Sequence, residues 1–276
     1  MLKEGKIPLL SVRDLCVDFC SRGKVSPVVR NISFFLNKGE ILAIVGESGS
    51  GKSVTSQALT GLLPESPTCQ IRGSALLGGK ELIGLRERDL RKVRGKEIGY
   101  IFQDPLSSLN PTYTVGFQIE EMMKIHLPGM PSRERRARVA EVLDAVGIRP
   151  ELASAFPHEF SGGMQQRVMI AMALAANPKI LIADEPTTAL DVTIQKQIMN
   201  LLLDLRERFG MSILLITHNF GIVSEIADRV CVFYRGEKLE EGPARELIAH
   251  PQHAYTRALL ACVPRLNQFA FPQGSI

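Results

Sequence analysis

Tryptophan is absent from this sequence, and aromatic residues of all kinds make up only 6% of its 276 residues. Proteins that bind single-stranded nucleic acid stack the bases on exposed aromatic side chains, so this composition argues against such a function. The net charge of +4 is only mildly basic. It is compatible with binding a polyanion or with a position near an anionic membrane surface, but it requires neither. We therefore expect no nucleic-acid partner.

The sequence also lacks an apolar run of the roughly 18 residues that a membrane-spanning helix needs. Its longest apolar run, residues 168–176, falls within a segment that has the pattern of an amphipathic helix. The first residues show neither a long apolar stretch nor a signal-peptide cleavage pattern. These absences predict a chain that is cytosolic or peripheral to a membrane, so any pore that it serves would belong to a partner.

Cysteine is scarce and scattered, with five residues and no CxxC pair. An odd number of cysteines without paired spacing argues against both a disulfide framework and a zinc site. Cys16 and Cys20 could share one face of a strand, where we expect them to pack as small buried hydrophobes. The other cysteines are Cys69, Cys231 and Cys262.

What the sequence does contain is a set of short, β-rich apolar runs at both ends and a mostly helical middle. The predicted strands cover residues 9–19, 28–36, 41–45, 71–77, 97–102, 180–183, 212–217, 230–234 and 238–241. Strands that alternate with helices predict an α/β fold with a parallel sheet. Residues 103–178 form a predicted helical block inserted between strands of that core. The basic stretch 133–138 opens a helix there, and we interpret it as a solvated helix face rather than a nucleic-acid patch.

The most specific local motif matches G-x-x-x-x-G-K-[ST] at every position. Its residues are Gly46, Glu47, Ser48, Gly49, Ser50, Gly51, Lys52 and Ser53. A strand over residues 41–45 precedes the motif, and a helix is predicted over residues 52–63. This is the context of a P-loop, in which backbone N–H groups and a helix N-terminus surround phosphate oxygens. We expect Lys52 to reach the β- and γ-phosphates and Ser53 to ligate Mg²⁺.

A second apolar strand, residues 180–183, ends in Asp184 and Glu185. Two carboxylates at the carboxyl end of a buried strand suit a P-loop site. Asp184 would hold Mg²⁺ through water, and Glu185 would polarise the attacking water. A strand that simply ends in solvated acids is the alternative, and the complete P-loop weakens it. His218 ends another strand, either as an ordinary polar terminus or as a sensor of the γ-phosphate, since a neutral imidazole can donate a hydrogen bond.

A second candidate anion-binding loop lies far from the P-loop in sequence. Ser161, Gly162 and Gly163 precede a predicted helix and would present a hydroxyl and free N–H groups at its start. One triphosphate site needs only one such cradle. The second loop therefore suggests that a site is completed by another chain.

Together, these motifs resemble those of the ATP-binding cassette (ABC) ATPases in type and order. Asp184 and Glu185 correspond to the Walker B carboxylates and His218 to the switch histidine. Phe19, at the place of the aromatic residue that stacks on adenine, is a looser match. Met164 is a departure from the family pattern, because many members have Gln there. The remaining correspondences are the Q-loop glutamine Gln103, the signature loop Ser161–Gly163 and the D-loop Ala189-Leu190-Asp191.

This resemblance implies a P-loop (RecA-like) core with an N-terminal antiparallel β-subdomain and an inserted α-helical subdomain. The core would comprise about residues 1–102 and 179–250, the helical subdomain 103–178, and a short C-terminal helical tail 251–276. The family pairs two ATPase units head to tail, so that each ATP lies between one P-loop and the other unit's signature loop. ATP and Mg²⁺ are the implied cofactors. Glu185, His218 and Gln103 would act in hydrolysis, Asp191 at the nucleotide, and Gln103 also at the metal.

Two further stretches resemble importers of dipeptides, oligopeptides and nickel: residues 103–111 (QDPLSSLNP) and 250–260 (HPQHAYTRALL). Such importers are bacterial or archaeal, and their ATPases lie on the cytoplasmic face of the cell membrane. The implied partners are a second, related ATPase in a heterodimer, two permease subunits and an extracytoplasmic solute-binding protein. Many peptide-type members hold an iron–sulfur cluster in a cysteine-rich tail, but a single Cys262 cannot, so no cluster is expected. Peptide and metal or metallophore cargo both stay open.

Three rival interpretations carry different expectations. A soluble ABC ATPase of DNA repair or of ribosomes usually has two cassettes, long coiled-coil insertions or zinc modules, and the sequence shows none of these. A non-catalytic regulatory cassette would lack Glu185 or His218. A kinase built on the same P-loop would have no use for the Ser161–Gly163 loop together with Asp191.

Overall fold

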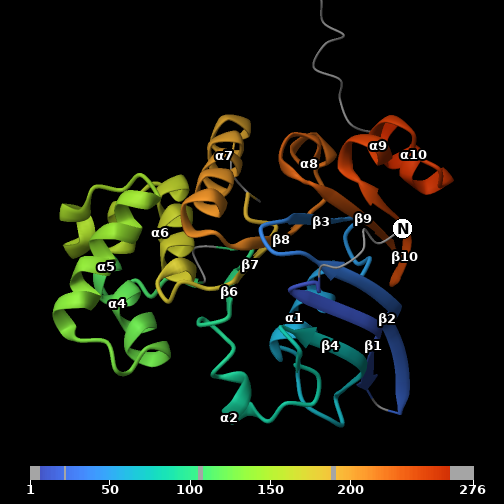
Figure 1. Cartoon of the computed structure of the whole chain (residues 1–276), viewed down its shortest axis with the longest axis horizontal. Helices are drawn as coiled ribbons and strands as arrows, with labels where there is room; N and C mark the ends of the chain where they lie inside the picture. Colours follow the sequence, from blue (N-terminus) through green and yellow to red (C-terminus); the bar gives the residue numbers. More distant parts are fainter. Residues whose placement is uncertain (1–6, 22, 105–107, 188–190, 262–276) are drawn as a thin grey trace, which may run out of the picture.

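The computed structural model of the chain describes residues 7–21, 23–104, 108–187 and 191–261. Two β-sheets and a series of helices make up these residues (Figure 1). The larger sheet has six strands in the order β10-β9-β3-β8-β7-β6, and all of them except β10 run parallel to their neighbours. The smaller sheet has four antiparallel strands in the order β2-β1-β4-β5.

The central strands of the larger sheet are apolar along almost their whole length. Every residue of β3, β7 and β8 is buried. Parallel strands that are covered on both faces carry such continuous apolar runs, and their carboxyl ends meet at one edge of the sheet. The strands are β3 (Ile41–Val45), β6 (Ile98–Ile101), β7 (Ile180–Asp184), β8 (Ser212–Thr217), β9 (Arg229–Tyr234) and β10 (Glu237–Pro243).

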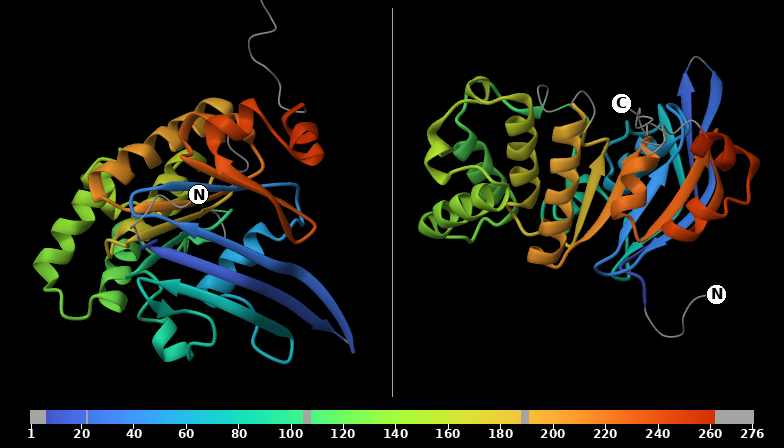
Figure 2. Two further views of the ribbon diagram at one scale, coloured as in Figure 1. Left: turned by 45° about the vertical axis from the view of Figure 1, so that its right-hand side comes forward. Right: turned by 90° about the horizontal axis from the view of Figure 1, so that it is seen from above.

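The smaller sheet packs against the larger one with α1 (Lys52–Thr60) between them (Figures 1 and 2). Ala58 and Leu59 of α1 belong to the same core cluster as Leu15 and Ile182, which lie on the two sheets. This packing fixes the first turn of α1 and therefore the P-loop that leads into it. The strands are β1 (Leu10–Ser21), β2 (Lys24–Leu36), β4 (Cys69–Leu77) and β5 (Lys80–Glu81).

Most helices after the P-loop helix form two groups, toward opposite ends of the larger sheet. Figures 1 and 2 show α4, α5 and α6 together on the side of β6, and α8, α9 and α10 on the side of β9 and β10. The helices are α2 (Glu87–Leu90), α4 (Val115–His126), α5 (Ser132–Ala145), the 3₁₀ turns η1 (Pro150–Ser154) and η2 (Pro157–Glu159), α6 (Gly162–Leu174), α7 (Val192–Phe209), α8 (Phe220–Ile226), α9 (Ala244–Ala249) and α10 (Ala254–Ala261). Of the described helices, none combines the length and the apolar character that crossing a membrane requires.

Both helical groups share hydrophobic cores with the sheet. Ile119 of α4 and Val168 of α6 belong to one cluster with Leu181 of β7. Phe220 of α8 belongs to another cluster with Val45 of β3, and α10 packs partly buried side chains against it. Because the first cluster runs without a break from the helical block into the sheet, the boundary near residue 103 between core and helical subdomain stays a prediction.

The predicted α/β fold is confirmed, with small differences at the ends of elements. The helix after the P-loop ends at Thr60 rather than 63, because Gly61 adopts the left-handed conformation (φ 61°) that closes a helix. Two short elements, β5 and α2, were not expected. The cysteines that the structure describes are free, and Cys69 and Cys231 are buried, whereas Cys262 lies outside the described residues.

The basic stretch 133–138 is only partly a solvated helix face. Arg133 and Arg136 are exposed. Arg135, in contrast, pairs with Glu120 at 3.0 Å, and Arg138 donates to the carbonyl of Leu174 at 3.0 Å. Two of the arginines therefore join helices within the block, a use that their charge alone does not predict.

Candidate functional site

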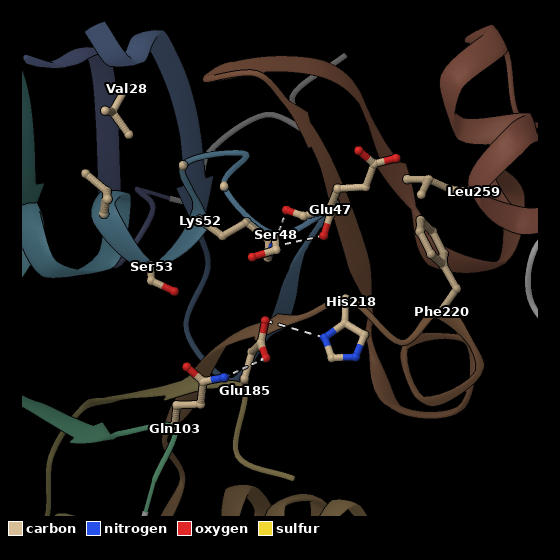
Figure 3. Close-up of a pocket in the computed structure, with 14 residues that line it drawn as sticks. Val28, Glu47, Ser48, Lys52, Ser53, Gln103, Glu185, His218, Phe220 and Leu259 are labelled. Carbon is tan, nitrogen blue, oxygen red and sulfur yellow. Dashed lines mark hydrogen bonds and ion pairs between the residues drawn. The ribbon is translucent and has the colours of Figure 1, made fainter. Parts of the chain in front are cut away.

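The P-loop connects β3 to α1 and lines a cleft of about 600 Å³ (Figure 3). Gly46 and Gly51 have φ of 152° and 98°, in the region that favours glycine. A Cβ at Gly46 would lie 2.1 Å from the carbonyl oxygen of Phe233, so no side chain fits there. Within the described part of the chain, the buried Ser50 hydroxyl has no hydrogen-bond partner. Residues from other elements complete the lining: Val28, Val54, Gln103, Glu185, His218, Phe220 and Leu259.

Lys52 is buried under this loop, with 4% of its surface exposed. Its ammonium group donates hydrogen bonds to the carbonyl oxygens of Gly46 and Glu47, at 2.8 Å each. Burial lowers the pKa of Lys52, and nearby carboxylates, Glu185 foremost, act in the opposite direction. The side chain therefore lies at the loop itself, and its contact with the β- and γ-phosphates stays a prediction.

Asp184, at the end of β7, is held by two hydroxyl groups. Ser53 donates to its Oδ1 at 2.8 Å, and Tyr100 donates to its Oδ2 at 2.9 Å. Burial raises the pKa of Asp184, while these two hydrogen bonds act to lower it. Burial also raises the pKa of Tyr100, so its hydroxyl stays protonated as a donor. The tyrosine hydroxyl lies 2.9 Å from Ser56 as well, which anchors it to α1.

This oxygen-rich pair suits Mg²⁺, which proteins bind through one or two carboxylates together with substrate phosphates. The Ser53 hydroxyl and the Asp184 carboxylate are already adjacent, at 2.8 Å. The orphaned hydroxyl of Ser50 lies in the same loop. The donor set therefore fits a metal–triphosphate ligand at the mouth of the P-loop.

Glu185 lies between Gln103 and His218, which approach its carboxylate from two sides (Figure 3). Gln103 Nε2 donates to Oε2 at 3.2 Å, and His218 Nδ1 lies 3.4 Å from Oε1. The three residues follow β6, β7 and β8, which are neighbours in the sheet. Glu185 has a φ of 46°, in the left-handed region, and its N–H donates to the carbonyl of Ile216 at 2.9 Å. A single carboxylate is thus oriented toward the cleft by its own backbone and by two polar neighbours.

The predicted signature and D-loop residues lie elsewhere. Ser161 is the N-cap of α6, where its hydroxyl accepts from the N–H of Met164 at 3.4 Å. Asp191 is the N-cap of α7, where its Oδ1 accepts from the N–H of Ile194 at 2.9 Å. Of the described residues, those that line the P-loop cleft include neither of these two nor the glycines at 162 and 163.

These two helix starts nevertheless touch each other. A Cβ built on Gly163 would lie 3.0 Å from Cγ2 of Ile194, so the start of α6 packs tightly on the first turn of α7. The structure therefore brings the starts of α6 and α7 together at a place outside the P-loop cleft of the same chain. Ala189 and Leu190 of the predicted D-loop lie outside the described residues, as do residues 105–107 of the predicted Q-loop region.

Phe19 is half-buried on β1 and packs against the core cluster between the two sheets rather than lining the cleft. Its role at adenine stays a prediction. Two tyrosines at the site were not singled out from the sequence: Tyr100, which holds Asp184, and Tyr255, whose hydroxyl accepts from the N–H of Glu47 at 3.2 Å. Only Tyr100 could have been found from the sequence, because a tyrosine in a buried strand needs a hydrogen-bond partner for its hydroxyl. Tyr255 lies in a helix and gives no such signal.

Comparisons with known proteins agree with this geometry. A family model described as ABC transporter matches residues 29–188, which include the P-loop, the Ser161–Gly163 loop and both carboxylates after β7. A second model, described as Oligopeptide/dipeptide transporter, C-terminal region, matches residues 239–271. That segment contains α9 and α10.

Curated relatives match nearly the whole chain. The oligopeptide transport ATP-binding protein OppD of Bacillus subtilis is 54% identical over 261 residues, which are 94% of this chain and 73% of that protein. The peptidoglycan transport ATP-binding protein YejF of Agrobacterium fabrum is 54% identical over 260 residues, which are 94% of this chain and 47% of that protein. This chain therefore spans about half the length of the second relative.

Among solved structures, the dimeric ATP-binding cassette MJ0796, in a post-hydrolysis state bound to ADP and Pi, has a TM-score of 0.75 to this chain. The two are 30% identical, and the match covers 86% of this chain and 99% of that one. The likeness thus extends over the whole of a cassette that has been captured with the products of ATP hydrolysis.

Proposed function

Because this chain belongs to the ABC transporter family of ATPases, we propose that its cleft binds and hydrolyses ATP to energise the import of peptides through membrane-embedded partners. The observation that carries the proposal is the convergence of strand ends on one cleft. Lys52 and Ser53 follow β3, Glu185 follows β7, and Gln103 and His218 follow β6 and β8. A phosphate cradle, an oxygen pair for a metal and an oriented carboxylate therefore meet at one place.

Each group has a part in phosphoryl transfer to water. Lys52 and the loop N–H groups stabilise negative charge on the phosphates. Ser53 and Asp184 would hold Mg²⁺, which neutralises part of the triphosphate charge when bound. Glu185 orients and polarises the attacking water. Gln103 and His218, at 3.2 Å and 3.4 Å from the Glu185 carboxylate, keep it in position.

The separation of the Ser161–Gly163 loop from the cleft supports a site shared between two ATPase subunits. Ser161 and Gly162 are exposed, and none of the three loop residues lines the chain's own P-loop cleft. Exposed N–H groups at a helix start are suited to an anion on a facing molecule. We propose that this loop, with Asp191 beside it, completes the ATP site of a second, related ATPase in a heterodimer.

The permease contact is proposed at a second cavity of about 490 Å³ on the side of the helical block. Leu62 and Phe102 border it and are 40% and 43% exposed, which is high for large apolar side chains. Tyr100 also lines the cavity, so one side chain both borders the cavity and holds the Asp184 carboxylate. A permease segment that inserts here would be close enough to sense the nucleotide site. The chain would then act at the cytoplasmic face of the membrane, with the solute-binding protein on the other side.

Peptide cargo is favoured over nickel or metallophore cargo by the relatives. OppD is named for oligopeptide transport and YejF for peptidoglycan transport, and residues 239–271 match the C-terminal region of oligopeptide and dipeptide transporters. The latter match also counts against a soluble ABC ATPase that is not coupled to transport. The cargo itself would contact the permeases and the solute-binding protein.

The test is uptake by the complete transporter in liposomes, with ATP inside and its solute-binding protein outside. We expect ATP hydrolysis to be stimulated by labelled peptides, and peptide to accumulate only with hydrolysable ATP. Accumulation of Ni²⁺ or of a metallophore, with no response to a peptide mixture, would refute the peptide assignment. Absence of ATP hydrolysis in the complete complex would refute the function itself.

A further inference from the structure

The helix α10 forms one wall of the P-loop cleft, although it lies about two hundred residues further along the chain. Leu259 of α10 lines the cleft beside Phe220, as Figure 3 shows. Tyr255 and Leu259 also pack against the hydrophobic cluster that contains Val45, the last residue before the P-loop. The end of β3 and α10 thus rest on the same core.

The tyrosine of this helix is bonded to the P-loop backbone itself. The Tyr255 hydroxyl accepts a hydrogen bond from the N–H of Glu47, with the two heavy atoms 3.2 Å apart. Its ring packs on Tyr234 at a centroid distance of 4.3 Å. Arg235 in turn lies 5.0 Å from the centre of the Tyr234 ring. Tyr255 is therefore located by its ring and is bonded through its hydroxyl.

The bonded peptide unit connects Tyr255 to the lysine of the motif. The N–H of Glu47 and the carbonyl of Gly46 belong to one rigid peptide plane. That carbonyl accepts from the Lys52 ammonium at 2.8 Å. Rotation of the peptide would break both hydrogen bonds together, so the tyrosine hydroxyl and the lysine hold the same plane from opposite sides.

The segment before α10 fixes where Tyr255 can lie. The Glu240 carboxylate on β10 accepts from the N–H of Gln252 at 2.8 Å and from that of His253 at 3.1 Å. Arg257 donates back to the carbonyl of Gln252 at 2.7 Å. Three charge-assisted hydrogen bonds therefore anchor the entry to α10, and such bonds are stronger than neutral ones.

We propose that Tyr255 is a positioning residue of the ATP site, which fixes the Gly46–Glu47 peptide and through it the Lys52 ammonium, so that the C-terminal region is part of the nucleotide site. The inference rests on the proposed ATP site at the P-loop. It predicts an effect on nucleotide binding rather than on the chemical step, because the Lys52 ammonium would contact the phosphates in the ground state and in the transition state alike.

The experiment compares Tyr255→Phe with Tyr234→Phe in the complete transporter. Both changes remove one hydroxyl from the same pair of rings, but in the described structure the Tyr234 hydroxyl makes no hydrogen bond, whereas that of Tyr255 accepts from Glu47. One neutral hydrogen bond corresponds to roughly a 2- to 10-fold change in binding. We expect Tyr255→Phe to weaken the photolabelling of this chain, separated from the partner ATPase by mass, by an azido-ATP analogue, and to raise the KM for ATP by that factor. The kcat and the melting temperature should stay nearly unchanged. Tyr234→Phe should leave all of these at wild-type values.

Two further variants make every outcome decisive. Lys52→Ala should abolish photolabelling of this chain by the azido-ATP analogue, and retained labelling of this chain would refute the proposed ATP site itself. If Lys52→Ala abolishes the labelling of this chain and Tyr255→Phe leaves it unchanged, the positioning role alone is refuted. Tyr255→Ala removes the ring as well. A loss of melting temperature in that variant, with wild-type behaviour of Tyr255→Phe, would assign Tyr255 to packing only and would overturn the inference.

Discussion

The hydroxyl of Tyr100 donates a hydrogen bond to Oδ2 of Asp184 over 2.9 Å, from a side chain that also borders the second cavity. The same carboxylate receives the Ser53 hydroxyl on its other oxygen. Asp184 is therefore oriented by the first turn of α1 and by a tyrosine of β6 that lines the second cavity. Loss of either hydrogen bond would therefore change the orientation of the Asp184 carboxylate.

We predict that Tyr100→Phe raises the Mg²⁺ concentration needed for half-maximal ATP hydrolysis several-fold. A hydrogen bond to a charged group contributes about 1.5–3 kcal/mol, and its loss would leave Asp184 less well oriented. A Mg²⁺ titration of the ATPase rate checks this. Tyr113→Phe is the matched control, because Tyr113 is 47% exposed and its ring stacks on Phe117. A Mg²⁺ dependence of Tyr100→Phe that overlays the wild type would contradict the assignment.

Glu185→Gln should slow steady-state ATP hydrolysis by a factor of about 10²–10⁴, the range for a general base, and should retain bound ATP. The amide keeps the shape of the side chain but loses the charge that polarises water. The measurements are the hydrolysis rate and the nucleotide content of the purified complex. Glu225→Gln, at an exposed position of α8, serves as the control. Undiminished turnover of Glu185→Gln would remove this residue from the mechanism.

Ser161→Arg should abolish hydrolysis at the partner ATPase's site and leave binding at this chain's own P-loop intact. The long side chain would fill the space that the proposed shared phosphate needs. Photolabelling with an azido-ATP analogue separates the two chains by mass. In the comparison variant, Lys52→Ala, labelling of this chain should be lost instead. Normal hydrolysis at the partner's site after Ser161→Arg would show that the loop does not act in trans.

Gly163→Ala should lower the activity of the complete transporter, and Ile194→Ala should restore part of that loss. The added methyl group would lie 3.0 Å from Cγ2 of Ile194, so the Ile194 side chain or the backbone that carries it must give by a few tenths of an ångström. A double-mutant cycle on the ATPase rate measures the coupling, which for residues in contact is about 0.5–3 kcal/mol. Gly129→Ala is the control, because a Cβ there meets nothing within 4 Å. Strictly additive effects would show that the two starts are independent.

Leu62→Glu should impair association with the permease while leaving ATP binding unchanged. Leu62 is 40% exposed at the second cavity, and a charge there would oppose insertion of an apolar segment. Co-purification with the permeases measures the association. Val25→Glu places the same charge at a residue that is 57% exposed on β2 and should have no effect. Equal permease yield from both variants would exclude the cavity as the docking place.

The candidate site residues that could be predicted from the sequence are those placed by their position at the end of a strand. The P-loop, the carboxylates after β7 and His218 all follow buried strands, and strand ends of a parallel sheet meet at one edge. Tyr255 could not be found in this way, because its partner Glu47 lies 208 residues earlier in the chain. That contact depends on how α10 packs on the core, which no local pattern encodes. Arg138 illustrates the same limit. Its charge predicts a side chain exposed to solvent, but the guanidinium donates hydrogen bonds to the carbonyls at the end of α6.

The backbone of Glu185, with its φ of 46°, has a consequence for the stability of the whole protein. Glycine or asparagine adopts this conformation more readily than glutamate, and holding a glutamate in it costs about 1–3 kcal/mol. Neither of the two easier residues carries a carboxylate to the point where Gln103 and His218 meet it. The strained glutamate thus lowers the stability of the fold at the residue that we propose as the general base. Selection for heat resistance alone would favour replacement of this glutamate, and on this proposal the more stable protein would have lost ATP hydrolysis.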